Sequence, residues 1–553
     1  MPRGWVLVLL ASVLVGGAAV TPHPREPVHV RLLAINDFHG HLTPPTGGIT
    51  IADPHDRTQP LRVPAGGAEH VATLVHMLRA QHPHTLFVAA GDLIGASPLL
   101  SALFHDEPTI EALSLMGLAL SAVGNHEFDH GPDELRRMQY GGCHPTEGCQ
   151  GPHPFPGATF QYLAANTIDT TSGQPLFPPY AVRHFDGVPV AFLGLTLQGT
   201  SQIVMPTSVA GLAFQDEAET VNRLVPVLRQ QGIEAIVVLI HQGGIPTGDY
   251  NECPGLSGPI VDIVQKLDKA VDVVVSGHTH RAYICMIDGR LVTSADKYGT
   301  LISAIDLTLD PQTRDVIAAR ATNVIARTDT YAKDPAQTQL IAAYAQRAAP
   351  LANRVVGRLT ASLTRDASPA GETVLGDVIA DAHLAATSAS QLGGAVLAFT
   401  NPGGIRTDLL LQGDGTVTYG DLFACQPFRN ALVTLTVSGE QIKQLLEQQW
   451  STQPKPRILQ VSQGFRYTWD ASRPVGDRVL AQSLTLHGQP LDPRGQYRVT
   501  VNAFLAAGGD GFSVLTEGQE RRVGMVDVDA LARYIQAMSP LSPGPLDRIQ
   551  HVP

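Results

Sequence analysis

The chain carries little charge, and its balance is acidic. Asp, Glu, Lys and Arg make up only 16% of the 553 residues, and the formal net charge is −12. A protein that binds a nucleic-acid polymer needs a basic surface for the phosphates, so this balance argues against such a partner. We find no tandem repeat and no coiled-coil heptad, which excludes solenoid and coiled-coil architectures. The length and the 44% of apolar residues instead predict several globular domains.

The five cysteines include no Cys-x-x-Cys pair, which argues against a structural zinc site. Their number fits an oxidising compartment, where two bridges can form. Cys143 and Cys149 flank a short loop with Pro and Gly, and we expect them to pair. Cys253 and Cys285 flank a Gly-His-Thr-His segment and are the next expected pair. Cys425 is left over, and we expect it to be a small buried apolar side chain.

No apolar run is long enough to cross a membrane. The run from Trp5 to Leu14 follows Arg3 and precedes Gly16–Ala19, a pattern typical of a secretory signal peptide over residues 1–19. No cysteine lies near the cleavage point, and residues 547–553 contain no apolar tail, so we expect no stable membrane anchor. The mature protein is predicted to be periplasmic or secreted.

Metal-ligand side chains follow several strand-like apolar runs in the first half of the chain. The segments are Asn36-Asp-Phe-His39, Gly91-Asp92, Gly124-Asn-His-Glu127 and Gly277-His-Thr-His280, with His241 after another apolar run. One Asp-x-His or Gly-Asp pair alone is typical of a turn or helix cap. Because side chains at the carboxyl ends of several strands converge on one crevice, all the segments together predict one site. Asp, Asn and His are donors that borderline divalent metals prefer.

The predicted site holds two divalent ions, of Zn, Mn, Co or a similar metal. Asp92 is the candidate for the ligand shared by both ions, since a carboxylate can serve two cations. The expected ligands of one ion are Asp37, His39 and His280, and those of the other are Asn125, His241 and His278. Two such ions can activate a water for in-line attack on a phosphate and clamp the phosphate oxygens.

His126 adjoins an expected ligand without having to bind metal itself. Asp129 follows three residues later and can orient the imidazole. We therefore expect His126 to stabilise charge on a transferring phosphoryl group or to protonate the leaving oxygen.

These segments resemble the calcineurin-like metallophosphoesterase superfamily, and the Asn36-Asp-Phe-His39 start narrows the resemblance to its 5′-nucleotidase/UDP-sugar hydrolase family. The second half of the chain is similar to the substrate-binding domain of that family. The similar segments are Asn401-Pro-Gly-Gly-Ile-Arg406, Gln426-Pro-Phe-Arg-Asn430 and Phe504-Leu-Ala-Ala-Gly-Gly-Asp-Gly-Phe512. The resemblance implies that Asn401 and Arg406 contact polar groups of the substrate. It also implies that Phe428 and Phe504 sandwich a base and that Asp510 reaches the ribose hydroxyls.

The resemblance implies a fold as well. We expect an α/β protein with a four-layer metallophosphoesterase β-sandwich flanked by helices over residues 28–326. A linker helix over 327–354 and a C-terminal α/β substrate-binding domain over 355–540 should follow. Apolar spacing predicts helices at 68–80, 374–386 and 438–449 and a surface insertion at 141–157. Further histidines without regular spacing are expected to be surface or helix residues, namely His76, His82, His84 and His105.

The implied reaction is hydrolysis of a nucleoside 5′-monophosphate to nucleoside and phosphate. Nucleoside di- and triphosphates, UDP-sugars and 2′,3′-cyclic nucleotides are alternative substrates for the same machinery. Two departures from the family leave the substrate open: Arg429 stands where Gly is usual, and residues 365–376 lack some basic positions. A non-catalytic nucleotide-binding surface protein is a further alternative, but it predicts decayed ligand positions, and every expected ligand is present.

Overall fold

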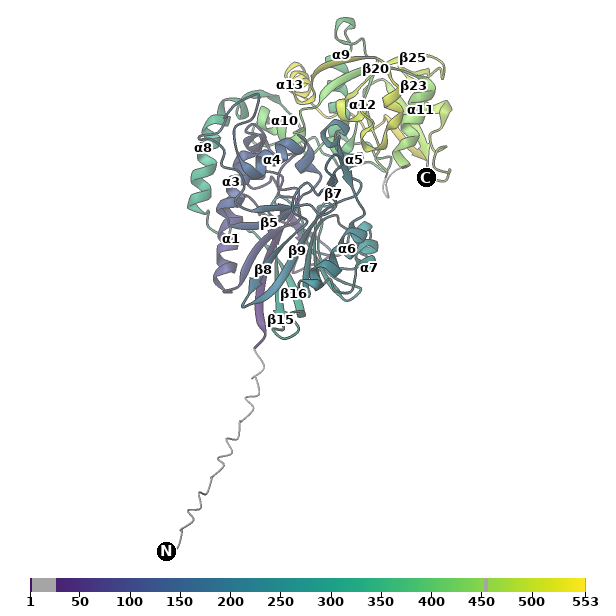
Figure 1. Cartoon of the computed structure of the whole chain (residues 1–553). Coiled ribbons are helices and arrows are strands. Elements are labelled where there is room, and N and C mark those ends of the chain that lie inside the picture. Colours follow the sequence, from purple (N-terminus) through teal and green to yellow (C-terminus); the bar gives the residue numbers. More distant parts are fainter. Residues whose placement is uncertain (2–25, 452–455, 553) are drawn as a thin grey trace.

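The computed structural model describes residues 1, 26–451 and 456–552 (Figure 1). The expected signal peptide, residues 1–19, lies outside the described residues apart from Met1. Figure 1 shows a strand-rich N-terminal body, coloured purple to teal, beside a C-terminal body coloured green to yellow.

Two six-stranded sheets form the centre of the N-terminal body. The first has the order β16-β15-β1-β4-β5-β6, with β1 at Val28–Ile35, β4 at Thr85–Ala89, β5 at Leu118–Ala122, β6 at Gln161–Leu163, β15 at Leu301–Leu309 and β16 at Val316–Ile325. The second has the order β13-β14-β12-β11-β9-β8, with β8 at Tyr180–Phe185, β9 at Val188–Thr196, β11 at Ala235–His241, β12 at Val273–Ser276, β13 at Ala282–Ile287 and β14 at Arg290–Ala295. Strands β1, β4, β5 and β6 are parallel, and so are β9, β11, β12 and β14. Parallel strands are covered on both faces, which explains why their sequences are continuous apolar runs.

The alternation of side chains along β1 assigns its residues to two cores. Leu32 and Ala34 belong to the core between the two sheets, whereas Leu33 and Ile35 face the core under the helices. Helices α1 (Ala68–Ala80) and α3 (Glu107–Leu115) cover the first sheet, and α6 (Glu217–Gln230) and α7 (Pro259–Lys266) cover the second. The resulting order of helix, sheet, sheet and helix confirms the expected four-layer sandwich.

Helix α8 (Pro335–Ala352) joins the two bodies. Its first turn is stabilised by Asp334, whose side chain accepts hydrogen bonds from the backbone N–H groups of Ala336 and Gln337. The helix packs against α1, α2 (Leu99–Ala102), α3 and α10 (Tyr419–Cys425). It is therefore a packed part of the structure rather than a free linker.

The C-terminal body is built on a five-stranded sheet of order β21-β18-β25-β20-β26. Its strands are β18 at Leu397–Thr400, β20 at Ala431–Ser438, β21 at Gln460–Val461, β25 at Gln496–Asn502 and β26 at Gln519–Val526. Helices α9 (Val374–Thr387) and α11 (Gly439–Glu447) lie where the sequence predicts them, and α13 (Asp527–Met538) packs on α9. A capping box formed by Ser438 and Gln441 begins α11.

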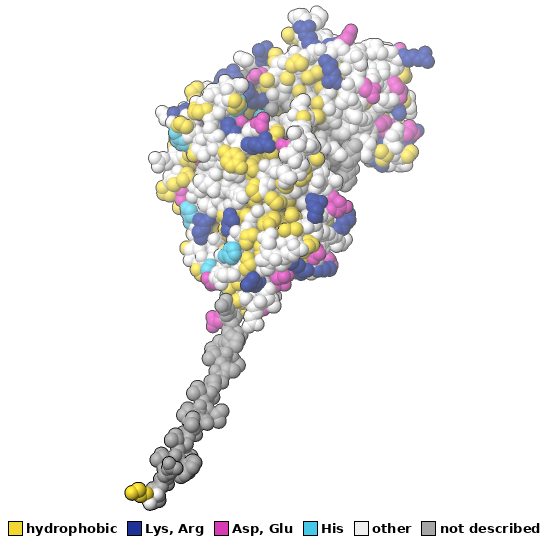
Figure 2. Space-filling view, in the orientation of Figure 1, with side chains coloured by type: hydrophobic (Ala, Val, Ile, Leu, Met, Phe, Trp, Pro, Cys, Tyr) yellow, Lys and Arg dark blue, Asp and Glu magenta, His cyan; other side chains and the backbone are white. Residues whose placement is uncertain are grey.

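The cysteines pair as predicted: the structure joins Cys143 to Cys149 and Cys253 to Cys285. Cys425 is buried, and its thiol contacts the carbonyl oxygen of Thr407 at 3.1 Å. None of the described helices is both long and apolar enough to cross a bilayer. On the face shown in Figure 2, basic and acidic side chains are interspersed, so no polyanion-binding patch is present on that face.

Candidate metal centre

The expected metal ligands converge where the carboxyl ends of the two sheets meet. Asp37 and His39 follow β1, and Asp92 follows β4. The remaining ligands lie at the ends of β5, β11 and β12, namely Asn125, His241, His278 and His280. The structure brings six of these side chains together in overlapping clusters, and Asn125 lines the same cavity as His278.

Asp37, His39 and His280 form the first cluster. The Oδ1 atom of Asp37 lies 3.3 Å from Nε2 of His280 and 3.8 Å from Nε2 of His39. The two histidine Nε2 atoms are 3.1 Å apart. The other carboxylate oxygen of Asp37 is held by the backbone N–H of His278 at 2.9 Å and by the amide of Asn36 at 2.6 Å. This leaves Oδ1 of Asp37 directed at the histidines.

Asp92 faces both clusters through one oxygen. Its Oδ2 atom lies 3.0 Å from Nε2 of His241 and 3.7 Å from Nε2 of His39. Its Oδ1 atom instead accepts the backbone N–H of His126 at 2.9 Å. Asp92, His241 and His278 form the second cluster. Oδ2 is therefore the atom of Asp92 that faces both groups of histidines.

The backbone at five of these ligands lies in the left-handed region, which is uncommon outside glycine. The φ angles are 51° at Asp37, 46° at His39, 50° at Asp92, 71° at His278 and 53° at His280. Such conformations cost about 1–3 kcal/mol each and persist where surrounding structure enforces them, typically at functional sites. The left-handed residues bend the chain sharply after the strands, so that ligand side chains close in sequence face the same site.

Two glycines of the sequence motifs are required because neighbouring atoms lie too close for a side chain. A Cβ on Gly124 would lie 2.2 Å from Oδ1 of Asp92. At Gly91, where φ is +83°, a Cβ would lie 2.6 Å from the backbone N of Gly124 and 2.9 Å from Nδ1 of His241. Any side chain at these positions would push the ligand turns apart.

Glu127 ends the Gly124-Asn-His-Glu127 segment, and the sequence alone predicts no role for it. The structure buries its carboxylate under the ligand turns, where it accepts the backbone N–H groups of Asp92 at 2.9 Å, Leu93 at 2.8 Å and Gly124 at 2.7 Å. It thereby ties the turn after β4 to the turn after β5. Its place in the Gly124-Asn-His-Glu127 segment is the only sequence signal for this role.

Backbone carbonyls orient two of the histidines. Nδ1 of His39 lies 2.9 Å from the oxygen of Gly95, and Nδ1 of His241 lies 2.8 Å from the oxygen of Ala90. Since a carbonyl only accepts, each Nδ1 carries the proton, which leaves Nε2 as the free ligand atom.

The donor set fits a pair of divalent cations. Buried Oδ1 of Asp37, Oδ1 of Asn125 and Nε2 of His241 have no hydrogen-bond partner among the described residues. Buried polar atoms are rarely left unsatisfied, and these three point into one site. Burial lowers the pKa of His278 to about 4 and that of His280 to about 3, which favours the neutral imidazole that binds metals.

His126 lies beside the cluster in the arrangement that the sequence predicts. Its Nδ1 atom is 2.8 Å from Oδ2 of Asp129. Burial alone lowers the pKa of His126, but Asp129 and Asp92 outweigh it and raise the pKa above its usual value. A ring that is held protonated can donate a proton or a hydrogen bond to an oxygen that gains charge.

A cavity of about 830 Å³ opens over the metal centre and reaches the C-terminal body. It is lined by both His126 and the five residues expected to bind substrate: Asn401, Arg406, Phe428, Phe504 and Asp510. The ring of Phe428 stacks near that of His126, with centroids 5.6 Å apart. The guanidinium of Arg406 lies 5.9 Å from the Phe428 ring. The two bodies therefore enclose one site.

Two polar residues of this cavity were not predicted from the sequence. Arg457 forms an ion pair with Asp510, and Asn502 donates a hydrogen bond to Asn401 at 3.0 Å. Asn401 in turn donates to Oδ2 of Asp510 at 2.8 Å. No local pattern marks Arg457 or Asn502, because their role depends on partners distant in the chain.

Comparison with known proteins agrees with both halves of the site. Residues 30–282 match the family model of the calcineurin-like phosphoesterases, and residues 355–517 match that of the 5′-nucleotidase C-terminal domain. The chain belongs to the 5′-nucleotidase family of calcineurin-like phosphoesterases. As a member of this family it is a hydrolase.

Individual relatives of this family show how much of the chain is shared. A cell wall protein, Lmo0130, from Listeria monocytogenes is 30% identical over 92% of this chain and 67% of its own length. The endonuclease YhcR from Bacillus subtilis is 31% identical over 93% of this chain, which spans only 40% of that relative. The crystal structure of a 5′-nucleotidase precursor from Thermus thermophilus is 28% identical, with a TM-score of 0.76 over 95% of this chain and 99% of that one.

Asp92→Asn should abolish turnover and lower the metal content of both positions. A neutral amide attracts two cations far more weakly than a carboxylate does. Metal per chain, measured by mass spectrometry after gel filtration, and phosphate release test this together. If the variant retains both metals and near-normal turnover, Asp92 is not the shared ligand.

His126→Ala should reduce the rate by about 10²–10⁴-fold, which is the scale expected for a general acid or a residue that stabilises developing charge, while leaving metal content unchanged. Asp129→Ala should cost less, because Asp129 only orients the ring. Parallel kinetics and metal analysis of the two variants distinguish the roles. Loss of metal in His126→Ala would make His126 a ligand instead.

Proposed function

We propose that the protein is a binuclear-metal phosphohydrolase that converts nucleoside 5′-monophosphates to nucleosides and phosphate. The observation that carries this proposal is the single cavity in which the metal-ligand cluster of one body faces an arginine and two aromatic rings of the other. A nucleotide needs a charged end for the phosphate and a flat apolar end for the base. The cavity offers both.

Arg406 is suited to bind the phosphate. Burial is the main influence on the pKa values of His39, His126 and His280, and it lowers all three. The positive charge of Arg406, from the C-terminal body, acts in the same direction as burial on each histidine, although nearby carboxylates raise the pKa of His126 overall. Such coupling across the cavity supports a guanidinium close to the metal centre. A guanidinium presents several N–H donors in a fixed plane and can bind two phosphate oxygens at once.

In this proposal the residues of the chain divide the work. Asp37, Asn125 and the histidines hold two divalent ions, with Asp92 shared between them. Such ions, when bound, activate a water and neutralise the phosphate charge. Arg406 orients the phosphoryl group for in-line attack, and protonated His126, held by Asp129, donates its proton to the leaving 5′ oxygen.

The nucleoside end is assigned to the C-terminal body. Phe504 is half-buried, and its ring lies against Gly509, where an added Cβ would come within 2.4 Å of it. Asp510 is fixed by Asn401 and Arg457, as a ribose-binding carboxylate needs to be. Arg429 lines the same cavity, is exposed and has a φ of 52°. A second phosphate would meet this cation, whereas a monophosphate leaves it in solvent, so Arg429 bears on the alternative di- and triphosphate substrates.

We infer that the enzyme is exported. The support is the signal-peptide pattern of residues 1–19 together with two disulfides, which persist in oxidising compartments. The name of the Listeria relative, a cell wall protein, also describes an exported protein. Breakdown of nucleotides outside the cytoplasm is the corresponding role.

Phosphate release, combined with chromatography of the nucleotide products, tests the function on a substrate panel, because hydrolysis of a UDP-sugar or a 2′,3′-cyclic nucleotide does not itself free phosphate. Apo-protein is supplied with Zn, Mn, Co, Mg or Ca and given nucleoside mono-, di- and triphosphates, a UDP-sugar and a 2′,3′-cyclic nucleotide. We expect the monophosphates to have the highest kcat/KM with at least one metal. Preference for a diester or a polyphosphate would reassign the substrate, and no turnover with any metal would contradict the proposal.

Removing the Phe504 ring should separate base binding from phosphate chemistry. A stacked base gains about 1–3 kcal/mol, so Phe504→Ala should raise KM for nucleotides by about 5–150-fold. Hydrolysis of p-nitrophenyl phosphate, which has no base, should change little. Phe504→Tyr keeps the aromatic face and serves as the control. If Phe504→Ala weakens both substrates equally, the ring is part of the core rather than of a base clamp.

A further inference from the structure

A second group of histidine and carboxylate side chains lines the same cavity away from the metal centre. His105, which the sequence predicts to be a surface or helix residue, lies in the turn between α2 and α3 and is half-buried at the cavity wall. Glu134 belongs to α4 (Pro132–Tyr140), and His144 and Glu147 belong to the loop that follows it. None of these residues is part of the clusters around Asp92.

The ligand atoms of His105, Glu134 and His144 all lie within 4.8 Å of one another. The two imidazole rings are stacked, with centroids 4.0 Å apart and an interplanar angle of 2°. Glu147 adds a fourth oxygen donor, since its Oε2 atom lies 3.1 Å from Nε2 of His105. Two imidazoles and two carboxylates are a donor set typical of Zn²⁺ and Co²⁺.

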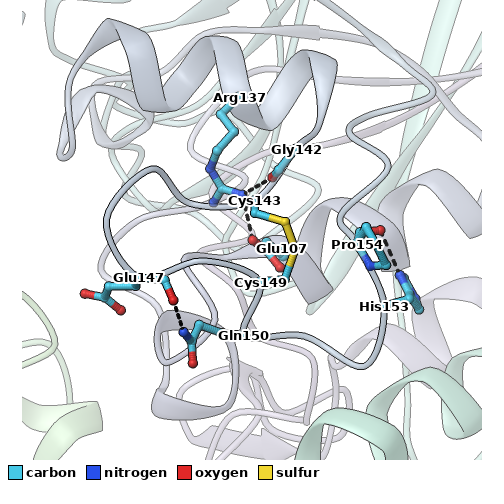
Figure 3. The surroundings of a disulfide bond; sticks show 9 residues. All are labelled: Glu107, Arg137, Gly142, Cys143, Glu147, Cys149, Gln150, His153 and Pro154. Carbon is cyan, nitrogen blue, oxygen red and sulfur yellow. Dashed lines mark hydrogen bonds and ion pairs between the residues drawn. A yellow bond between two sulfur atoms is a disulfide. The ribbon is translucent and has the colours of Figure 1, made fainter.

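The charge around this group also favours a cation. Arg137 is the one basic side chain bonded to the group in the described part of the chain. It donates to both oxygens of Glu134, at 2.9 and 2.7 Å, and to the buried Glu107, so Glu134 offers a metal only the lone pairs that this contact leaves. Figure 3 shows Arg137 reaching Glu107 and the backbone oxygen of Gly142, at 2.6 and 2.7 Å. The three carboxylates of Glu107, Glu134 and Glu147 therefore carry more negative charge than the guanidinium of Arg137 neutralises.

The disulfide restricts the loop that supplies two of the donors. His144 and Glu147 both lie between Cys143 and Cys149, which are joined across a sequence separation of 6 (Figure 3). A short closed loop has few conformations to lose, so ordering it around an ion costs less entropy.

We propose that His105, Glu134 and His144, assisted by Glu147, form a third divalent-metal site at the rim of the cavity. Ring nitrogens coordinate in the ring plane, so binding one ion by both stacked imidazoles requires the rings to turn about their Cβ–Cγ bonds. Nδ1 of His144 accepts a hydrogen bond from the backbone N–H of Glu147 at 3.2 Å. Rotation of the ring would break this hydrogen bond and free the nitrogen to bind the metal. Both rings are only half-buried, which leaves room for this rotation.

An ion in this site would fasten the disulfide loop to α4 and to the turn before α3. The cavity that this wall helps to enclose is also lined by Phe428 and Arg429 of the C-terminal body. The third ion would thus act on the shape of the rim and not on the bond that is hydrolysed.

Metal counting tests the proposal. Full-length protein is stripped with a chelator, reloaded with Zn²⁺ or Co²⁺ and passed through gel filtration before mass spectrometry. We expect about three ions per chain in the unmodified protein and about two in His105→Ala/His144→Ala. His130→Ala, an exposed histidine of the same cavity outside the cluster, should keep all of them.

Further variants keep the outcome interpretable. His144→Ala alone changes only the loop, so it should fold and still lose the rim ion. Asp92→Asn should lose ions of the metal centre and retain the rim ion, which separates this proposal from the one for catalysis. Cys143→Ser/Cys149→Ser should weaken rim binding by about tenfold in a Zn²⁺ titration. The proposal is wrong if the unmodified protein holds no more than about two ions, or if both histidine variants keep the third.

Discussion

The Oδ2 atom of Asp92 has to meet histidines from two different sheets at once. It lies 3.7 Å from His39, which follows a strand of the first sheet, and 3.0 Å from His241, which ends a strand of the second. This is possible only if the carboxyl ends of both parallel sets meet at one edge of the sandwich. The apolar core between the sheets fixes that meeting, because it packs residues of β1 and β4 against residues of β9, β11 and β12.

The strained turns around this carboxylate are stabilised by buried polar contacts rather than by the cores. Glu127 accepts hydrogen bonds from three backbone N–H groups of two turns. Asn36 bonds Asp37 and two backbone groups at the end of β14, those of Ala295 and Asp296. Burial and the charge of Asp92 raise the pKa of Glu127 to about 8, whereas the N–H donors favour its anion. The ligand geometry is thereby set before any substrate enters, which is what preorganised catalysis requires.

Three arginines of this acidic protein line one cavity, namely Arg406, Arg429 and Arg457, while the surface in Figure 2 mixes both signs. Acidic side chains line the same cavity, among them Asp129, Glu134 and Asp510, and Arg457 is paired with Asp510. The cavity therefore offers separate cationic and anionic positions, which suits a small molecule with distinct polar groups, whereas an extended basic face would suit a polyanion.

The sequence by itself determined the candidate ligands, the helices α1, α9 and α11 and the pairing of the cysteines. Each of these depends on local order, such as an apolar strand followed by Gly91-Asp92 or a helical period between caps. Tertiary structure alone decided that Glu127 ties two turns together, that Arg457 holds Asp510 and that His105 meets His144 at the cavity rim. Phe428 lies over His126 only because of how the two bodies are placed. These contacts join segments far apart in the chain, and the packing that sets their distances leaves no periodic pattern in the sequence.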